Sequence, residues 1–148
     1  MQKYVRKQIT LYSDGSSLGN PGPGGYGGIL EYNGYCKEYY GGEEYTTNNR
    51  MELLGVIEGL KMLKEPCDIT VVSDSSYVIK AINEWLEGWV NKDFKKVKNI
   101  DLWKKYLEVA KPHHIKGVWV RGHNGHPQNE RCDQLARTEA ERIQQNLT

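Results

Sequence analysis

Four acidic residues of this 148-residue chain, Asp14, Glu52, Asp74 and Asp133, stand where strands are expected to end or helices to begin or turn inward. In α/β proteins, sites form at the ends of sheet strands. Hard divalent cations such as Mg²⁺ prefer oxygen ligands, commonly one or two carboxylates each with water and substrate phosphate. Four converging carboxylates would repel one another unless cations neutralised them. A pair of cations about 4 Å apart would clamp the attacking water and the leaving oxygen of a phosphodiester.

Two of these carboxylates also have a purely structural interpretation. Asp14 precedes Gly15, an ordinary turn pair. Glu52 follows Asn49 by three residues, the spacing of a capping box, in which the carboxylate accepts the Asn49 backbone N–H. Taken singly, each residue is explained more simply by local structure than by catalysis.

The other two carboxylates have similar alternatives. Asp74 or Ser75 would serve as the N-cap of a following helix. Asp133 precedes Arg137 by four residues, the spacing of a surface ion pair worth a few tenths of a kcal/mol. Only a fold that brings all four together would favour the metal site.

The elements that must position these residues begin with strands. Alternating and β-branched residues predict a strand over 4–13 that stops at Asp14 and is followed by a glycine-rich loop. Residues 26–32 and 35–40 flank an Asn-Gly dipeptide, which tolerates positive φ at both central turn positions and predicts a hairpin. The chain is therefore expected to open with three antiparallel strands.

The remainder alternates helices with strands. Helical periodicity covers 49–63, 78–86, 99–110 and 129–144, and strands are expected over 68–73 and 115–120. Strands joined by a helix favour parallel pairing, because such crossovers need one. The predicted fold class is α/β: a single domain over 1–148 with a five-stranded mixed sheet, its first three strands antiparallel, flanked by helices in the order βββαβααβα.

The composition is that of a soluble globular domain, with 38% hydrophobic and 26% charged residues and a net charge of +1. Neither a signal peptide nor a run of about 18 apolar residues occurs, so we expect a cytoplasmic protein with no membrane segment. The three cysteines are odd in number and fit no CxxC pattern, which argues against a disulfide framework or a zinc ribbon.

A basic segment, residues 92–111, stands out from this balanced charge. Seven lysines outnumber three acidic residues there, and Trp85, Trp89, Phe94 and Trp103 lie in or beside it. Lysines with aromatic side chains grip phosphates and stack on nucleotides. The alternative is a solvated helix face whose aromatic side chains belong to the core.

Five sequence blocks carry a resemblance to a known family. They are SDGSSLGNPGPGGYGG (13–28), TTNNRMEL (46–53), SDSSYV (73–78), VKNIDLW (97–103) and RGHNGHPQNERCDQLA (121–136). Their order and spacing resemble the type 1 ribonucleases H, most closely the bacterial enzymes. The resemblance implies the ribonuclease H-like fold and hydrolysis of the RNA strand of RNA·DNA hybrids, leaving 5′-phosphate and 3′-hydroxyl ends. It also implies a role in removing RNA primers and R-loop RNA during DNA replication and repair, by a protein expected to be a monomer.

The resemblance assigns roles to individual residues. Asp14, Glu52, Asp74 and Asp133 would hold two Mg²⁺ ions, with Mn²⁺ as an alternative, and Asp14 would bridge them. His123 would sit beside them on a mobile loop and move a proton or help product leave. The residues expected to contact the hybrid are Asn20, Thr47, Asn48, Asn49, Ser76, Trp85, Lys95 and Lys96.

Two other interpretations of motifs are set aside. His123, His126 and Cys132 lack a fourth zinc ligand at convincing spacing. The GPGGYG segment over 22–27 satisfies the dinucleotide pattern GxGxxG, but a strand and hairpin follow it where that motif needs a helix.

The chain departs from the family pattern at two places. Ser76 stands where many bacterial relatives have glutamine, and the basic protrusion between Trp85 and Val97 is shorter and less basic. Weaker hybrid affinity and greater salt sensitivity are the two alternatives that follow, and activity is expected in either case because all four carboxylates are present. Two rival functions are less well supported. A metal-dependent nuclease of the same fold acting on DNA would have no reason to carry TTNNR and RGHNGH together, and a hybrid-binding module without catalysis predicts the loss of at least one carboxylate, whereas all four are present.

Overall fold

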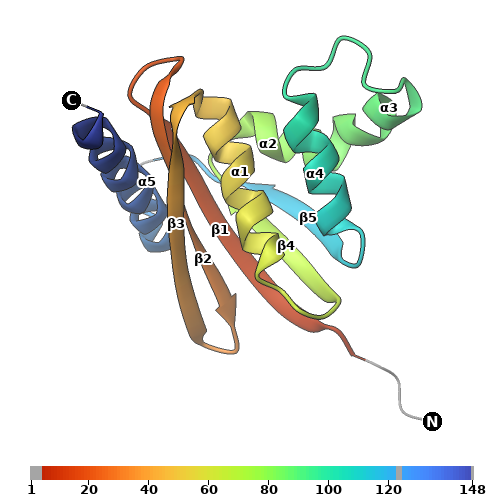
Figure 1. Ribbon diagram of the computed structural model, residues 1–148. Helices are drawn as coiled ribbons and strands as arrows, with labels where there is room; N and C mark the ends of the chain where they lie inside the picture. Colours follow the sequence, from red (N-terminus) through yellow and green to blue (C-terminus); the bar gives the residue numbers. More distant parts are fainter. Residues whose placement is uncertain (1–4, 123–124, 148) are drawn as a thin grey trace.

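The computed structural model describes residues 5–122 and 125–147, which form a five-stranded sheet in the order β3-β2-β1-β4-β5 with helices on both faces (Figure 1). The elements are β1 Lys7–Ser17, β2 Gly22–Tyr32, β3 Tyr35–Thr46, α1 Asn48–Lys61, β4 Cys67–Ser73, α2 Ser76–Lys80, η1 Ala81–Trp85, α3 Leu86–Asn91, α4 Ile100–Ala110, β5 His114–Trp119 and α5 Pro127–Asn146. Strands β1, β2 and β3 pair antiparallel, whereas β1, β4 and β5 pair parallel. The predicted mixed sheet and element order are confirmed.

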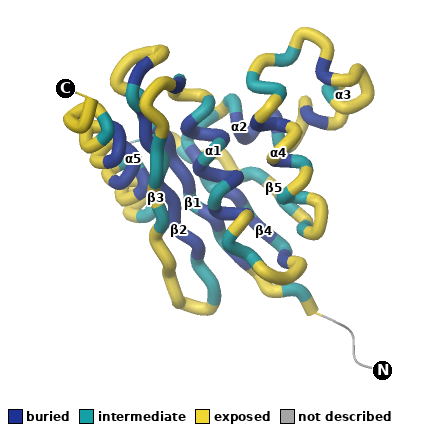
Figure 2. The backbone as a smooth tube through the Cα atoms, in the orientation of Figure 1, coloured by how far each residue is buried: buried dark blue, intermediate teal, exposed yellow. Residues whose placement is uncertain are grey.

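The sheet separates two layers of helices. Helices α1 and α4 cover one face and α5 covers the other, over β2 and β1 (Figure 1). The main core fills the first layer with side chains from both β1 and β4, such as Leu11 and Val71, and from α1, such as Ile57. In Figure 2 the central strands are buried along most of their length, while α3 and the chain after it are largely exposed.

The first strand extends further than the sequence predicts. β1 continues through Asp14 to Ser17, and Asp14 pairs with Gly27 of β2. The expected stop at Asp14 and the glycine-rich loop after it are therefore wrong for most of that segment. The glycines form β2 because helices approach the sheet there: a Cβ at Gly27 would lie 2.6 Å from the Cys132 carbonyl oxygen of α5.

The helix predicted over 78–86 is divided into three parts. α2 passes into the π-helical turn η1 and then into α3, and the backbone N–H of Leu86 donates to Ala81. Such turns occur often at functional sites. Trp85 ends this turn, and its ring lies 5.9 Å from that of Trp89.

A partly buried hydroxyl, that of Tyr77, ties α2 to α4. Tyr77 accepts hydrogen bonds from the indole N–H of the fully buried Trp103, at 2.9 Å, and from the Asn99 side-chain amide, at 3.1 Å. Replacing Tyr77 with Phe is expected to lower the free energy of unfolding by about 1–2 kcal/mol, because the indole N–H loses its partner in the core. Urea unfolding would measure this loss. Tyr106→Phe is the matched control, because its hydroxyl has no hydrogen bond to any residue that the structure describes. Equal losses in the two variants would contradict the expectation.

Candidate active site

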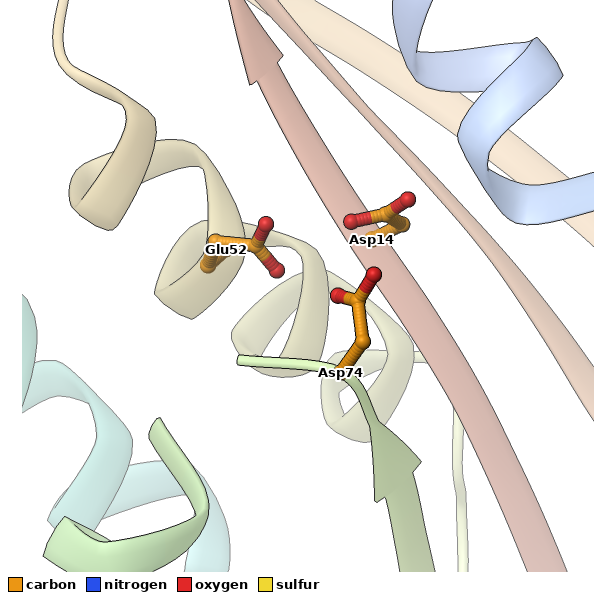
Figure 3. Close-up of side chains that lie close together, drawn as sticks. All are labelled: Asp14, Glu52 and Asp74. Atoms are coloured by element: carbon orange, nitrogen blue, oxygen red, sulfur yellow. The ribbon is translucent and has the colours of Figure 1, made fainter. Parts of the chain in front are cut away.

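Three carboxylates from separate elements meet at one edge of the sheet. Asp14 comes from β1, Glu52 from the first turns of α1, and Asp74 directly follows β4 (Figure 3). One oxygen of each lies within 4.8 Å of the others. The structure therefore brings together three of the four carboxylates singled out from the sequence.

Two glycines allow this close approach. A Cβ at Gly15 would collide with the backbone of Met51 and Glu52, so glycine lets α1 lie against β1. A Cβ at Gly122 would lie 2.6 Å from Asp74 Oδ2. Because Gly15 and Gly122 lack a side chain, neighbouring backbone and carboxylate atoms can approach closely enough to form the cluster.

Helix caps explain why the carboxylates are free to face one another. The capping box that was the structural alternative for Glu52 does not form: Thr47 caps α1, and its hydroxyl accepts the Arg50 N–H at 3.3 Å. Ser75 caps α2 by accepting the Val78 N–H, as the sequence allowed. Neither Glu52 nor Asp74 is occupied as a cap.

Burial dominates the electrostatics of the cluster. Asp14 and Glu52 are only 4% and 7% exposed. Desolvation raises the pKa of Asp14 to about 7, and the charges of Asp74 and Asp133 add to the rise. Desolvation, followed by repulsion from Asp14, raises the pKa of Glu52 well above its usual range.

The cluster lacks compensating positive charge. Glu52 Oε2 is buried without a hydrogen-bond partner. Within residues 5–122 and 125–147, no lysine or arginine forms an ion pair with Asp14, Glu52 or Asp74. Buried carboxylates need a counter-charge to stay ionised, and oxygen donors suit hard divalent cations. The donor set therefore fits a divalent metal site.

The fourth carboxylate, Asp133, lies nearby on α5 but is held differently. It is close enough to raise the pKa of Asp14. Its Oδ2 accepts from Arg137 Nε at 2.9 Å, so the surface pair predicted from the four-residue spacing does form. In this structure the two interpretations of Asp133 are compatible.

Removing this arginine is expected to ease metal binding. Because the Arg137 side chain is 57% exposed, its hold on Asp133 is worth only a few tenths of a kcal/mol. Arg137→Gln should therefore lower the Kd for Mg²⁺ by about twofold. Calorimetric titration of the hybrid-free protein would measure the change. Arg142→Gln, which breaks a similar pair with Glu139 elsewhere on α5, is the control. A weaker affinity for Mg²⁺ would contradict this expectation.

The residues expected to contact substrate around α1 gather beside the cluster. Asn20 Oδ1 accepts the Asn48 N–H at 3.2 Å, and Asn48 Oδ1 accepts the Ser17 N–H at 3.0 Å. Asn48, Asn49 and Ser76 line a polar hollow of about 320 Å³ together with Glu52 and Asp74. These side chains thus border the carboxylates.

The other expected contacts lie farther along the chain. Trp85 is partly exposed at the end of η1, and Lys95 and Lys96 are exposed in the connection between α3 and α4. That connection stands away from the sheet in Figure 1. His123 lies outside the described residues, so its predicted role stays a prediction.

Two contributors to the site were missed from the sequence. Arg50 makes two hydrogen bonds to Asp101, at 3.0 and 2.8 Å, and joins the start of α1 to the start of α4. Trp119 donates its indole N–H to the Asp74 backbone carbonyl at 3.1 Å. Arg50 and Asp101 both lie in the blocks quoted above, but only the fold shows that they pair.

The fold and the cluster define a protein class: α/β proteins that use a carboxylate-held divalent metal at the edge of a mixed sheet. Comparison with known proteins narrows this class. The RNase H family model matches residues 6–141. Ribonuclease H of Sulfurovum sp. (strain NBC37-1) is 79% identical over 147 residues, covering 99% of this chain and 100% of that protein.

Solved structures of type 1 RNases H have a similar fold. LC9-RNase H1, a type 1 RNase H with the type 2 active-site motif, is 30% identical, with a TM-score of 0.86 over 96% of this chain and 76% of the other. LC11-RNase H1, solved in complex with an RNA/DNA hybrid, shares the fold at 22% identity, with a TM-score of 0.70 over 90% of this chain and 97% of the other. The chain belongs to the ribonuclease H family, as a type 1 member. It is accordingly a metal-dependent endoribonuclease that hydrolyses RNA in RNA·DNA hybrids.

Proposed function

We propose that Asp14, Glu52, Asp74 and Asp133 hold two Mg²⁺ ions, with Mn²⁺ as an alternative, and that the RNA strand is cut there to leave 5′-phosphate and 3′-hydroxyl ends. The convergence of the first three carboxylates is the observation that carries this proposal. Bound cations would supply Lewis acidity to the scissile phosphate and lower the pKa of the attacking water. Burial of Asp14 and Glu52 keeps bulk water from competing, and the Gly15 N–H, 2.9 Å from Asp14 Oδ1, orients that carboxylate.

The polar hollow beside the cluster is the place where RNA is distinguished from DNA. A protein recognises RNA through its 2′-hydroxyl across a wide, shallow minor groove. Asn48, Asn49 and Ser76 offer short donors and acceptors there, and Asn20 braces Asn48. Thr47 holds a DNA phosphate in addition to capping α1.

More distant residues extend the contact with the hybrid. Trp85 packs on the sugar-phosphate backbone, and Lys95 and Lys96 contact phosphates from the exposed connection after α3. His123 moves a proton or aids product release. No helix among the described residues is long and apolar enough to cross a membrane. The protein acts as a cytoplasmic monomer that removes RNA primers and R-loop RNA during DNA replication and repair.

Gel-resolved cleavage of a labelled RNA·DNA hybrid, beside DNA duplex and RNA duplex, tests the proposal. We expect cutting of the hybrid RNA alone, with Mg²⁺ but not with EDTA, and fragments that carry 5′-phosphate ends. Cutting of the DNA duplex would indicate the DNA nuclease, and tight hybrid binding without cutting would indicate the binding module.

A further inference from the structure

A second hollow lies on the other side of α2 from the polar hollow. It has a volume of about 470 Å³ and lies between α2–η1 and β5, lined by residues that include Ser76, Lys80, Asn83, Gly117 and Trp119. We call it the β5 groove. Ser76 lines both hollows, so the β5 groove is adjacent to the polar hollow beside the carboxylate cluster.

Trp119 ties one wall of the β5 groove to the carboxylate cluster. Its indole N–H is fixed on the Asp74 carbonyl, yet the residue is 52% exposed. A large aromatic side chain held by its polar edge presents its apolar surface to whatever lies in the groove. Aromatic surfaces of this kind stack on bases and pack on sugars without regard to sequence.

The floor of the β5 groove is fixed. The Asn83 side chain donates to the Gly117 carbonyl and accepts the Gly117 N–H, both at 2.9 Å. A Cβ at Gly117 would lie 3.1 Å from Ile79 Cδ1 and 3.3 Å from Asn83 Oδ1. The absence of a side chain at Gly117 therefore keeps this part of the groove open, and Asn83 holds η1 against β5.

The charges of the groove suit one phosphate contact. Lys80 is exposed, and no ion pair is seen for it among the residues described. Glu84 also lines the groove, so the lining is not uniformly basic. A single free ammonium group beside an apolar ring matches one phosphate and its neighbouring sugar.

We propose that the β5 groove binds the RNA strand next to the scissile phosphate, with Lys80 contacting an RNA phosphate and Trp119 packing on an adjacent sugar or base. This inference rests on the proposed function and deepens it. The occupant is the RNA strand because the strand that is cut beside Asp74 continues covalently from the scissile phosphate, and Ser76 borders both the hollow at Asp74 and the β5 groove. Such a contact adds to hybrid binding at the position where Ser76 replaces a longer side chain.

Lys80→Gln is the first test. We expect KM for hybrid cleavage to rise three- to tenfold with kcat within twofold, and the slope of log KM against log salt to fall by about one. Glu84→Gln should shift KM in the opposite direction, by up to about twofold. Lys116→Gln is the matched control, since Lys116 is exposed on β5, the strand that carries Gly117 and Trp119, but does not line the groove.

A second test uses uncharged phosphate analogues to identify which strand of the hybrid Lys80 contacts. Hybrids carry one methylphosphonate linkage on a 2′-O-methyl nucleotide, at successive RNA or DNA positions, and are compared with the same nucleotide bearing an ordinary phosphate. At one RNA position near the cut, the methylphosphonate should raise the KM of the wild type by the same factor as the Lys80→Gln substitution does. At that position it should not raise the KM of the Lys80→Gln variant any further. The inference would be overturned if this effect occurred at a DNA position. It would also be overturned if the methylphosphonate raised KM equally in the wild type and the variant at every position.

Two substitutions of Trp119 separate packing from positioning. Trp119→Phe keeps a ring but loses the N–H and should keep hybrid affinity within about threefold, whereas Trp119→Ala should weaken it five- to tenfold. Equal affinities for the two variants would contradict packing on RNA. A wild-type protein that cleaves no hybrid overturns the proposed function and this inference with it. Cleavage that is insensitive to Lys80→Gln overturns this inference alone.

Discussion

Replacing Asp14 with Asn is expected to lower the rate of hybrid cleavage by at least about 10³-fold while leaving hybrid affinity within about threefold. One oxygen of Asp14 lies within 4.8 Å of Glu52 and Asp74, and the asparagine keeps the shape of the side chain and an oxygen for the Gly15 N–H. What disappears is one negative charge at the place where the proposal puts the cations. The predicted effect is therefore on catalysis and not on folding or on the surfaces that hold the hybrid.

Single-turnover cleavage and hybrid binding in EDTA, measured on the same preparation, separate these effects. Asp68→Asn is the control, because Asp68 lies on β4, the strand that leads to Asp74, but pairs with His114 away from the cluster. It should cleave within about twofold of the wild type. Cleavage by Asp14→Asn within tenfold of the wild type would refute the assignment of this residue.

The order of elements could be predicted from the sequence because each helix and strand has its own local periodicity. The extent of β1 could not, because its last residues pair with glycines of β2 that contribute no apolar pattern. Those glycines predicted a loop by propensity. Their role in the fold depends on contact with α5, which lies more than 100 residues later in the chain.

The site shows the same division between local and distant information. Each carboxylate could be picked out because it stood at a predicted strand or helix end, but their convergence depends on tertiary packing around Gly15. The cap of α1 was misplaced by two residues, since Thr47, Asn48 and Asn49 are all good caps and only the backbone geometry selects Thr47. Likewise, no sequence pattern links Trp119 to Asp74, because that hydrogen bond joins the ends of two parallel strands.

In the absence of metal, the protein is expected to lose stability as pH rises. The folded-state pKa of Asp14, about 7, exceeds its ordinary value of 3.8, and that of Glu52 is also raised. A carboxyl whose pKa is raised on folding contributes stability that is complete below its unfolded pKa and is lost as pH rises through its folded pKa. For Asp14 alone the loss between pH 4 and 8 is on the order of 4 kcal/mol.

Divalent metal should reverse this trend. Cations that bind only the folded protein stabilise it by mass action, and they favour the ionised carboxylates. Urea unfolding from pH 6.5 to 8.5 would show a falling curve in EDTA and a flatter or rising one in Mg²⁺. Asp14 accounts for about 1 kcal/mol of the fall in EDTA, because the rest of its loss lies below pH 6.5. This window avoids His113, whose pKa is lowered by burial and which therefore costs stability only as pH falls below about 6.5.

Glu52→Gln isolates the cause of the trend. Glutamine cannot ionise, so this variant avoids both the desolvation of a Glu52 carboxylate and its repulsion by Asp14. It should therefore be more stable than the wild type in EDTA at pH 8 and should gain less from Mg²⁺. Glu58→Gln, on the same helix but paired with Lys61, should follow the wild-type curve. A wild-type stability in EDTA that stays level or rises across this window would mean that neither burial nor mutual repulsion opposes ionisation of these carboxylates. The case for a site built to be neutralised by divalent cations would then lose its electrostatic basis.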